Sequence, residues 1–236
     1  MSHKKSLRSD LWQARCALLG ILLLQWLVQS ELHLAGRRIW ALTALELLLL
    51  VALTITSEVH VSRAQVVRDT HLQFTPMQAG SVRAIALALF GFVSLINLAG
   101  LVRLIASLLF TSGPEAQVLL ADALNLFATN VIIFALWYWE LDRGGPYRRS
   151  SLHSCSADFL FPQMTLDNAT LEHYGLKFWK PRFMDYLYVA FTNATAFSPT
   201  DTLPVSRMAK VLMMVQAAVS LMTIAIVAAR AVNILK

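Results

Sequence analysis

Five stretches of the chain are hydrophobic over a length that can cross a bilayer. A helix of roughly 20 residues spans a hydrocarbon core of about 30 Å. The expected spans are Leu11–Gln29, Ile39–Ser57, Val82–Phe110, Ala116–Leu141 and Arg207–Leu235. No small-residue cleavage site follows the first stretch, which we interpret as a retained helix rather than a signal peptide. The pattern predicts an all-α integral membrane protein with about five transmembrane helices.

One further apolar stretch is too short to span a membrane. It begins after Pro181, a residue suited to a first helical turn, and ends near Thr195. A polar, irregular stretch up to Pro204 follows it, and then the last span begins. Irregular backbone at membrane depth is tolerated only where protein or a water-filled cavity surrounds it. This order predicts a re-entrant helix and loop before the last transmembrane helix.

The predicted elements form two parts. Residues 1–115 hold three N-terminal membrane helices, and residues 116–236 hold an outer helix, a surface loop, the re-entrant helix and an inner helix. The third and fourth spans are joined by a tight turn at Thr111–Glu115 and are expected to form an antiparallel hairpin. The polar region Asp142–Arg182 is expected to fold over the membrane surface, since it opens with the turn sequence Asp-Arg-Gly-Gly-Pro.

Composition agrees with a membrane protein and narrows its chemistry. Hydrophobic residues make up 57% of the chain and charged residues only 14%. The net charge of +6 comes without a dense basic tract, so it favours contact with anionic lipid over nucleic-acid binding. Two cysteines and scattered histidines make no convincing metal site. We expect no cofactor, and no catalytic constellation argues for an enzyme.

The last part of the chain resembles the pore module of potassium channels, in which a pore helix and a filter precede Asp-x-x-Pro and the inner helix. Ala194 and Thr195 match the Ala-Thr of that family, and Asp201 and Pro204 match its Asp-x-x-Pro without a gap. The resemblance covers about Phe183–Asn233. It implies an ion channel assembled as a homotetramer, because each chain supplies a quarter of a pore, with a monovalent cation as the permeant species.

The filter itself departs from the family. Its Thr-Val-Gly-Tyr-Gly is replaced here, and no glycine occurs after Gly175. Potassium filters use stacked backbone carbonyls, which the glycines permit, so selectivity for potassium is not expected. The pore and filter residues implied by the resemblance are Thr195, Ala196, Phe197, Ser198, Pro199, Thr200 and Asp201. Either the hydroxyls and the carboxylate favour partly hydrated cations, or Phe197 and Pro199 close the loop and it serves only structure.

Two other phrases resemble those of uncharacterised bacterial inner-membrane proteins. They are Trp139-Glu-Leu-Asp-Arg-Gly-Gly-Pro146 and Asp158-Phe-Leu-Phe-Pro162. We therefore expect a multi-pass protein of the inner membrane. The excess of loop Lys and Arg on the side of the Asp142–Arg182 region makes that side cytoplasmic, whereas the channel resemblance places it outside.

Polar residues inside the spans are the remaining candidate site. Gln216, Ser220, Thr223 and Arg230 share one face of the last span by helical spacing. That face either lines a pore or joins helices through hydrogen bonds. An intramembrane charge layer consists of Glu46, Arg103, Asp122 and Arg230, with Arg103 and Asp122 as the expected pair. The layer is either a gating or proton-linked site or a neutral structural network. The open alternatives to a channel are a non-conducting assembly or sensor protein and a small proton-coupled transporter.

Overall fold

The computed structural model describes most of the chain and is mostly helical. The described residues are 3–31, 47–48, 50–52, 54–55, 57–59, 61, 65–67, 71–73, 76–110, 116–149, 156–177, 179–195 and 201–234. The elements are α1 (His3–Glu31), β1 (Gln65–Val67), β2 (His71–Gln73), α3 (Pro76–Phe110), α4 (Ala116–Leu141), η1 (Asp142–Gly144), α5 (Pro146–Arg149), β3 (Phe159–Leu160), η2 (Pro162–Met164), α6 (Asn168–His173), α7 (Phe183–Thr195), β4 (Leu203–Pro204) and α8 (Arg207–Ile234).

Three helices in the described part are long and apolar enough to cross a membrane. Their apolar stretches are Gly80–Ala106 in α3, Leu120–Gly144 at α4 and Arg207–Ala229 in α8. They coincide with the predicted third, fourth and fifth spans, so the structure supports a membrane protein. The predicted first span lies within α1. Most of the predicted second span, and the turn at Thr111–Glu115, lie outside the described residues, so the count of five stays a prediction.

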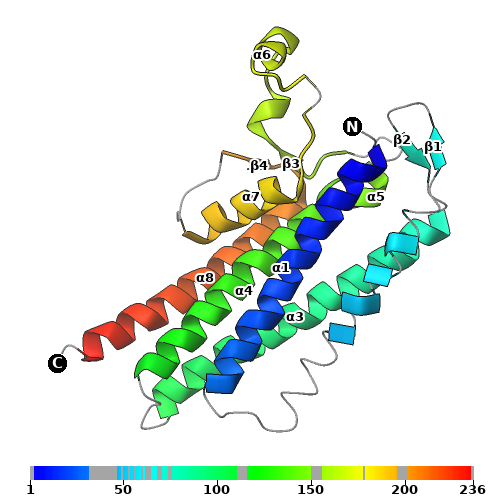
Figure 1. Ribbon diagram of the computed structural model, residues 1–236. Coiled ribbons are helices and arrows are strands. Elements are labelled where there is room, and N and C mark those ends of the chain that lie inside the picture. The colour runs from blue at the N-terminus through cyan, green and yellow to red at the C-terminus, as the bar shows by residue number, and fades with distance from the viewer. Residues whose placement is uncertain are drawn as a thin grey trace.

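The long helices lie side by side with α4 in the middle (Figure 1). It packs against α1, α3, α7 and α8. Because it is surrounded, its second half is closely packed, and Ile133, Ala135, Leu136 and Tyr138 are fully buried. The short α7 lies against α4 and α8 at one end of the bundle. We call this the loop end, because η1, α5, β3, β4 and the projecting α6 are also there, whereas the C-terminus lies at the opposite end.

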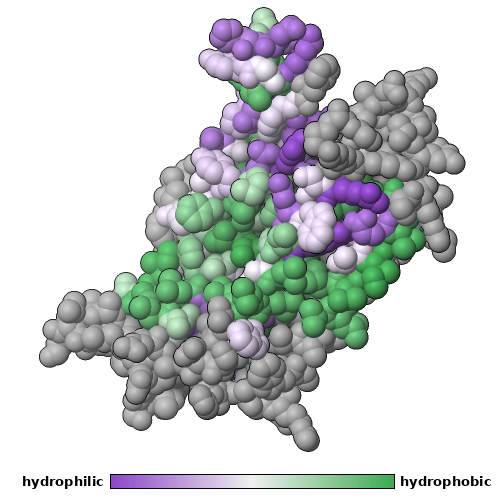
Figure 2. Space-filling model, in the orientation of Figure 1, coloured by the Kyte–Doolittle hydropathy of each residue, from purple (hydrophilic) through white to green (hydrophobic). Residues whose placement is uncertain are grey.

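The outer surface of the bundle is apolar where a bilayer would surround it. Large hydrophobic side chains are exposed along α3, α4 and α8, for example Leu95, Leu124 and Met214. Hydrophilic residues instead gather on the arm that carries α6 and at the bundle end below it (Figure 2). We define this arm as residues 162–180. A polar end above an apolar belt is the distribution expected for a helical membrane protein.

Two short strand pairs occur that the hydrophobic pattern does not predict. β1 and β2 form an antiparallel hairpin, and β3 pairs antiparallel with β4, with Phe159 opposite Pro204 and Leu160 opposite Leu203. The β3–β4 pair joins the surface loop to the segment just before α8. Strands of two or three residues carry no usable period, so sequence reasoning could not have found them.

The turn that ends α4 uses three consecutive residues with positive φ. These are Arg143 (φ 52°), Gly144 (φ 75°) and Gly145 (φ 95°). Glycine adopts such angles without steric cost, which explains the Gly-Gly pair in the predicted turn. A Cβ atom at Gly145 would lie 2.6 Å from Oε1 of Glu140. The turn is therefore specific to glycine for reasons of both conformation and space.

We expect Gly145→Ala to lower the free energy of unfolding by about 1–3 kcal/mol, because it adds strain at positive φ and a contact with a buried carboxylate. Gly91→Ala is the matched control, since nothing lies within 4 Å of a Cβ built at this helical position in α3. It should leave the unfolding temperature unchanged or raise it slightly. Thermal unfolding in detergent measures both, and equal unfolding temperatures would contradict the prediction.

Candidate functional site at the junction of α4, α7 and α8

A buried carboxylate, Asp142, lies where α4 ends, and it has no exposed surface. Its Oδ1 accepts hydrogen bonds from the backbone N–H groups of Asp158 (2.8 Å) and Phe159 (3.3 Å). Its Oδ2 accepts one from the Tyr186 hydroxyl at 2.6 Å, and Nε of Arg143 is 3.8 Å away. A buried charge is costly unless such donors compensate it. Asp142 therefore fixes the positions of β3 and of α7 relative to α4.

Arg149 also contacts the end of α4 and the Tyr186 ring of α7. Its Nη1 donates to the backbone carbonyls of Trp139 (2.6 Å) and Asp142 (2.7 Å) at the end of α4, and the Asp142 carbonyl also accepts from Gly145 N. Its guanidinium also lies over the rings of Trp139 and Tyr186, 5.8 and 5.3 Å from the centroids. Burial raises the pKa of the Tyr186 phenol. Tyr186 therefore stays protonated and remains a donor to Asp142.

The order imposed by Asp142 extends to the start of α8 through β3. The backbone carbonyl of Asp158 accepts a hydrogen bond from Val205 N at 2.8 Å, and β3 pairs with β4 immediately before α8. The Oδ2 of Asp158 accepts from the backbone N–H of Arg143 at 3.2 Å. The two phrases flagged in the sequence, Trp139–Pro146 and Asp158–Pro162, thus contact each other and hold both α7 and the start of α8.

A second polar group lies deeper in the bundle and centres on Gln216 of α8, which is fully buried. Its Oε1 accepts from the Tyr138 hydroxyl and from Nδ2 of Asn193 (2.8 Å), and its Nε2 donates to the Ala190 carbonyl (2.8 Å). One side chain therefore bonds to both α4 and α7. In an apolar surrounding, such bonds join helices that have no hydrophobic reason to associate.

Asn130 and Ser220 continue this group toward the other end of the bundle. Nδ2 of Asn130 donates to Ser220 Oγ (2.8 Å) and to the Gln216 carbonyl (3.2 Å). Ser220 and Thr223 are each 1% exposed. The polar face predicted on the last span thus points into the chain, toward α4 and α7. The structure shows helix-joining contacts for this face, while its service as a pore lining stays a prediction.

The other predicted site residues are placed as follows. Thr195 is the last residue of α7, and its hydroxyl donates to the Phe191 carbonyl. Asp201 is exposed. Arg103 of α3 is exposed and acts electrostatically on the partly buried Asp122 of α4, while their pairing stays a prediction. The remaining residues are Ala196, Phe197, Ser198, Pro199, Thr200 and Glu46, which lie outside the described residues, and Arg230, which belongs to α8 but whose side chain is not described.

Sequence reasoning missed a charged cluster between α1, α3 and α4 at the loop end. Arg15 of α1 is buried, forms an ion pair with Glu58 at 2.8 Å and donates to the Ser57 hydroxyl. Glu140 of α4 is also buried and lies 3.8 Å from Nε of Arg83. A cavity of about 20 Å³, lined by Arg15, Glu140 and Tyr147 among others, has room for one water molecule. A charge inside a predicted apolar span, such as Arg15, was the signal that could have revealed it.

The polar contacts of the whole junction serve to position helices and loops relative to one another. Its acids are occupied by backbone, hydroxyl and guanidinium donors, and its amides bond to one another across helices. Among the described residues, no group of three or more His, Cys, Asp or Glu side chains could hold a metal ion. What the arrangement does achieve is to hold a short helix, α7, against α4 and α8, two helices that are long and apolar enough to cross a membrane.

We expect Asp142→Asn to lower the free energy of unfolding by about 2–4 kcal/mol, because the amide cannot accept all the hydrogen bonds that the buried carboxylate accepts. Asp201→Asn, at an exposed position, is the control and should change stability by less than about 0.5 kcal/mol. Thermal unfolding of both variants measures the difference. If Asp142→Asn unfolds at the wild-type temperature, Asp142 does not organise the junction.

A pH dependence follows from Asp10, which precedes the apolar part of α1. Burial raises the pKa of its carboxyl from 3.8 to about 6, although Arg182 and Arg149 act to lower it. Between these two pH values the unfolded chain has already lost the proton that the folded chain keeps. Ionisation of Asp10 therefore reduces stability as pH rises through this window, and the reduction is complete above about pH 6.

We expect Asp10→Asn to raise the unfolding temperature at pH 7.5 and to have little effect near pH 4, where the wild-type carboxyl is protonated in the folded state. Glu172→Gln, in an exposed pair with Lys177, is the control and should give the wild-type profile. The measurement is the unfolding temperature at several pH values. A gain that is the same at both ends of the range would disprove the assignment to Asp10.

Comparison with known proteins identifies no relative for this chain. No family model matches it, and neither a curated protein nor a solved structure matches. The proposals that follow therefore rest on the residues and their geometry.

Proposed function

We propose that the chain is a multi-pass protein of the inner membrane that assembles as a homotetramer and passes monovalent cations through a pore-loop module. The module consists of α4 as the outer helix, α7 as the pore helix and α8 as the inner helix. The observation that supports this proposal most directly is the depth at which α7 ends.

The depth of α7 can be measured against α8. Near its start, Tyr186 bonds to Asp142 at the end of α4. Near its end, Asn193 bonds to the Met213 carbonyl (3.0 Å) and to Gln216. Gln216 lies nine residues after Arg207, which at 1.5 Å per residue is about 13 Å along α8. If the hydrocarbon layer begins near Arg207, as proposed here, a helix that enters from the loop end stops at about the middle of its 30 Å.

A helix that stops at this depth needs protein cover on its outer side. Its last backbone carbonyls have no partners within the helix, and a lipid tail cannot supply any. The side of α7 turned away from α4 and α8 carries Met184, Tyr188 and Phe191, each more than half exposed. Further copies of this chain, arranged around a central axis, would cover this side and enclose the loop. Four copies follow from the resemblance to a module that supplies a quarter of a pore.

The structure changes which face of α8 is proposed to line such a pore. Gln216, Ser220 and Thr223 bond or pack inside the chain. The outward face instead carries large apolar side chains and alanines, and these are Val211, Met214, Val215, Ala218, Leu221, Met222 and Ala225. The pore below the loop would then be apolar, and cation preference would come from Asp201, whose exposed carboxylates from four copies would form a ring at the mouth.

A second candidate function is a non-conducting membrane assembly or sensor protein. The observation that favours it is the same apolar outward face of α8, because a narrow apolar pore excludes water and ions. In this case the Gln216 contacts and the Asp142 contacts serve only to hold α7 in place. Both candidates require an oligomer, and they differ only in whether the enclosed loop conducts.

We expect the purified tetramer in liposomes to pass monovalent cations, and Asp201→Asn to reduce the preference of cations over anions several-fold by removing the ring of charge. Glu172→Gln removes an exposed acid on the arm instead and should leave this preference unchanged. An ion-flux assay with cation and anion gradients measures both. Absence of flux in a confirmed tetramer would reject the channel and support the non-conducting candidate, while a monomer in lipid would reject both.

A further inference from the structure

Four arginines lie at or near the turn that ends α4 in the described part of the chain. Arg149 is folded inward over Trp139 and Tyr186. Arg143 approaches Asp142, and its Nη2 contacts the Met164 sulfur at 3.3 Å. The other two, Arg83 of α3 and Arg148 of α5, converge on Gly144.

The distances at Gly144 define this convergence. A Cβ atom built on Gly144 would lie 3.3 Å from Nη1 of Arg148 and 3.4 Å from Nη1 of Arg83. The two nitrogens are therefore no farther apart than the sum of these distances, which allows one phosphate to accept a hydrogen bond of about 2.8 Å from each. Nη1 of Arg83 also donates to the Gly144 carbonyl at 3.1 Å, which fixes its guanidinium beside the turn.

Three acids lie at this turn in the described part of the chain. Glu140 and Asp142 are buried, and Glu140 lies 3.8 Å from Arg83. The third is Asp158, whose Oδ2 accepts from the backbone N–H of Arg143. The Arg83 side chain is 31% exposed and Arg148 is also exposed, so an anion from outside can reach both. A phosphate suits such a place because guanidinium groups bind its oxygens with matched geometry.

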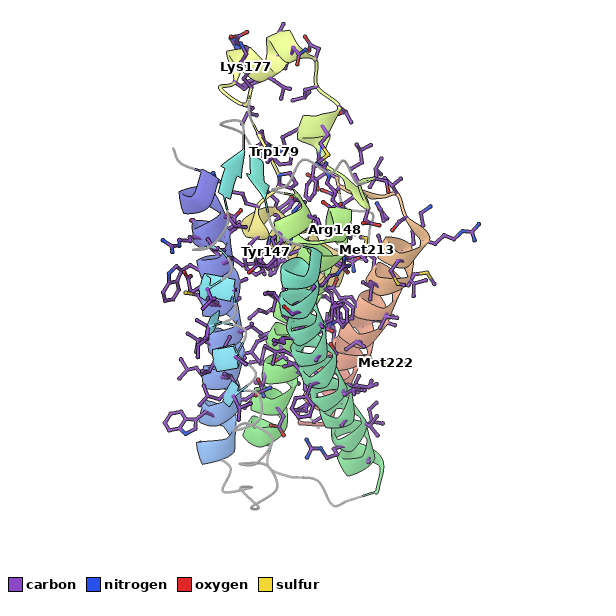
Figure 3. All side chains as sticks on the ribbon, turned by 90° about the vertical axis from the view of Figure 1, so that its right-hand side faces the viewer. Tyr147, Arg148, Lys177, Trp179, Met213 and Met222 are labelled. Atoms are coloured by element: carbon purple, nitrogen blue, oxygen red, sulfur yellow. The ribbon has the colours of Figure 1, made fainter. Side chains whose placement is uncertain are left out.

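The position of the pair relative to the apolar belt indicates the source of that phosphate. Gly144 is the last residue of the apolar stretch at α4, and Arg83 lies three residues after the start of the apolar stretch of α3 at Gly80. Figure 3 shows Arg148 at the loop end of the bundle, beside the first turns of α3. This is the level at which the headgroups of a bilayer lie.

We propose that Arg83 and Arg148 form a binding site for the phosphate of an anionic membrane lipid. The lipid phosphate bridges the two guanidinium groups above Gly144, and its acyl chains lie along the apolar outer surface of α3. The site ties the ends of α3 and α5 together. It depends on a membrane location but not on whether the protein conducts ions.

The test compares binding of phosphatidylglycerol and phosphatidylcholine to delipidated protein in detergent, by native mass spectrometry and by thermal stabilisation. We expect preference for phosphatidylglycerol in the wild type. Arg148→Gln should weaken its binding about five-fold, as expected for one surface arginine, without affecting phosphatidylcholine. Arg83→Lys keeps the charge that faces Glu140 but loses the forked geometry, and it should also weaken the preference. Lys180→Gln, an equal loss of charge at an exposed position on the arm, should bind like the wild type.

Three results would overturn the proposal. The first is wild-type binding of phosphatidylglycerol by both Arg148→Gln and Arg83→Lys. The second is an equal loss in Lys180→Gln, which would show that only net charge matters. The third is equal stabilisation by inorganic phosphate at matched concentration, which would show a site for a soluble anion and not for a lipid.

Discussion

The hydrogen bonds to the Asp142 carboxylate are the interaction on which the rest of the loop end depends. A fully buried carboxylate is stable only if its lone pairs are satisfied, and here the donors come from two backbone N–H groups of β3 and from the Tyr186 hydroxyl of α7. Because each donor belongs to a different part of the chain from α4, satisfying the charge also places those parts. β3 then places β4 and the start of α8. A single charge at the end of the central helix thereby places both α7 and the start of α8.

The Gln216 contacts hold α7 at a second point, farther from the loop end of the bundle. Two anchors at different depths, Tyr186 near the start of α7 and Asn193 near its end, set the tilt of the helix as well as its position. Such precision needs polar contacts, because in a bilayer apolar side chains gain little by leaving lipid for protein. Gln216 on the buried polar face of α8 is thus explained by the presence of α7 beside it, whereas Ser220 on the same face bonds to Asn130 of α4. A helix without a short neighbour to hold would need no glutamine at this position.

Sequence reasoning found the elements that follow from local pattern and missed those that depend on distant partners. Hydrophobic length is a local property, so the helices α3, α4 and α8 were predicted close to their observed bounds. Helical spacing placed Gln216, Ser220 and Thr223 on one face, but spacing cannot say whether that face meets another helix or a pore. Asp142 was read only as part of a turn, because its donors lie 16, 17 and 44 residues away. The ion pair between Arg15 and Glu58 was not predicted for the same reason, because the two residues are 43 positions apart.

The position of the Asp142 bonds also explains how the arm can project so far from the bundle without loosening α7. The arm leaves the bundle after β3 and returns just before α7, and Asp142 binds both of these points directly. Phe161 and Trp179 pack against each other at the base of the arm, with ring centroids 5.6 Å apart, and so close it a second time. Beyond this contact the arm keeps a link to the turn through Met164, whose sulfur contacts Nη2 of Arg143, whereas α6 contains no buried residue. Changes in α6 are therefore expected to leave the junction in place, whereas a change at either point that Asp142 binds moves α7, β4 and the start of α8 together.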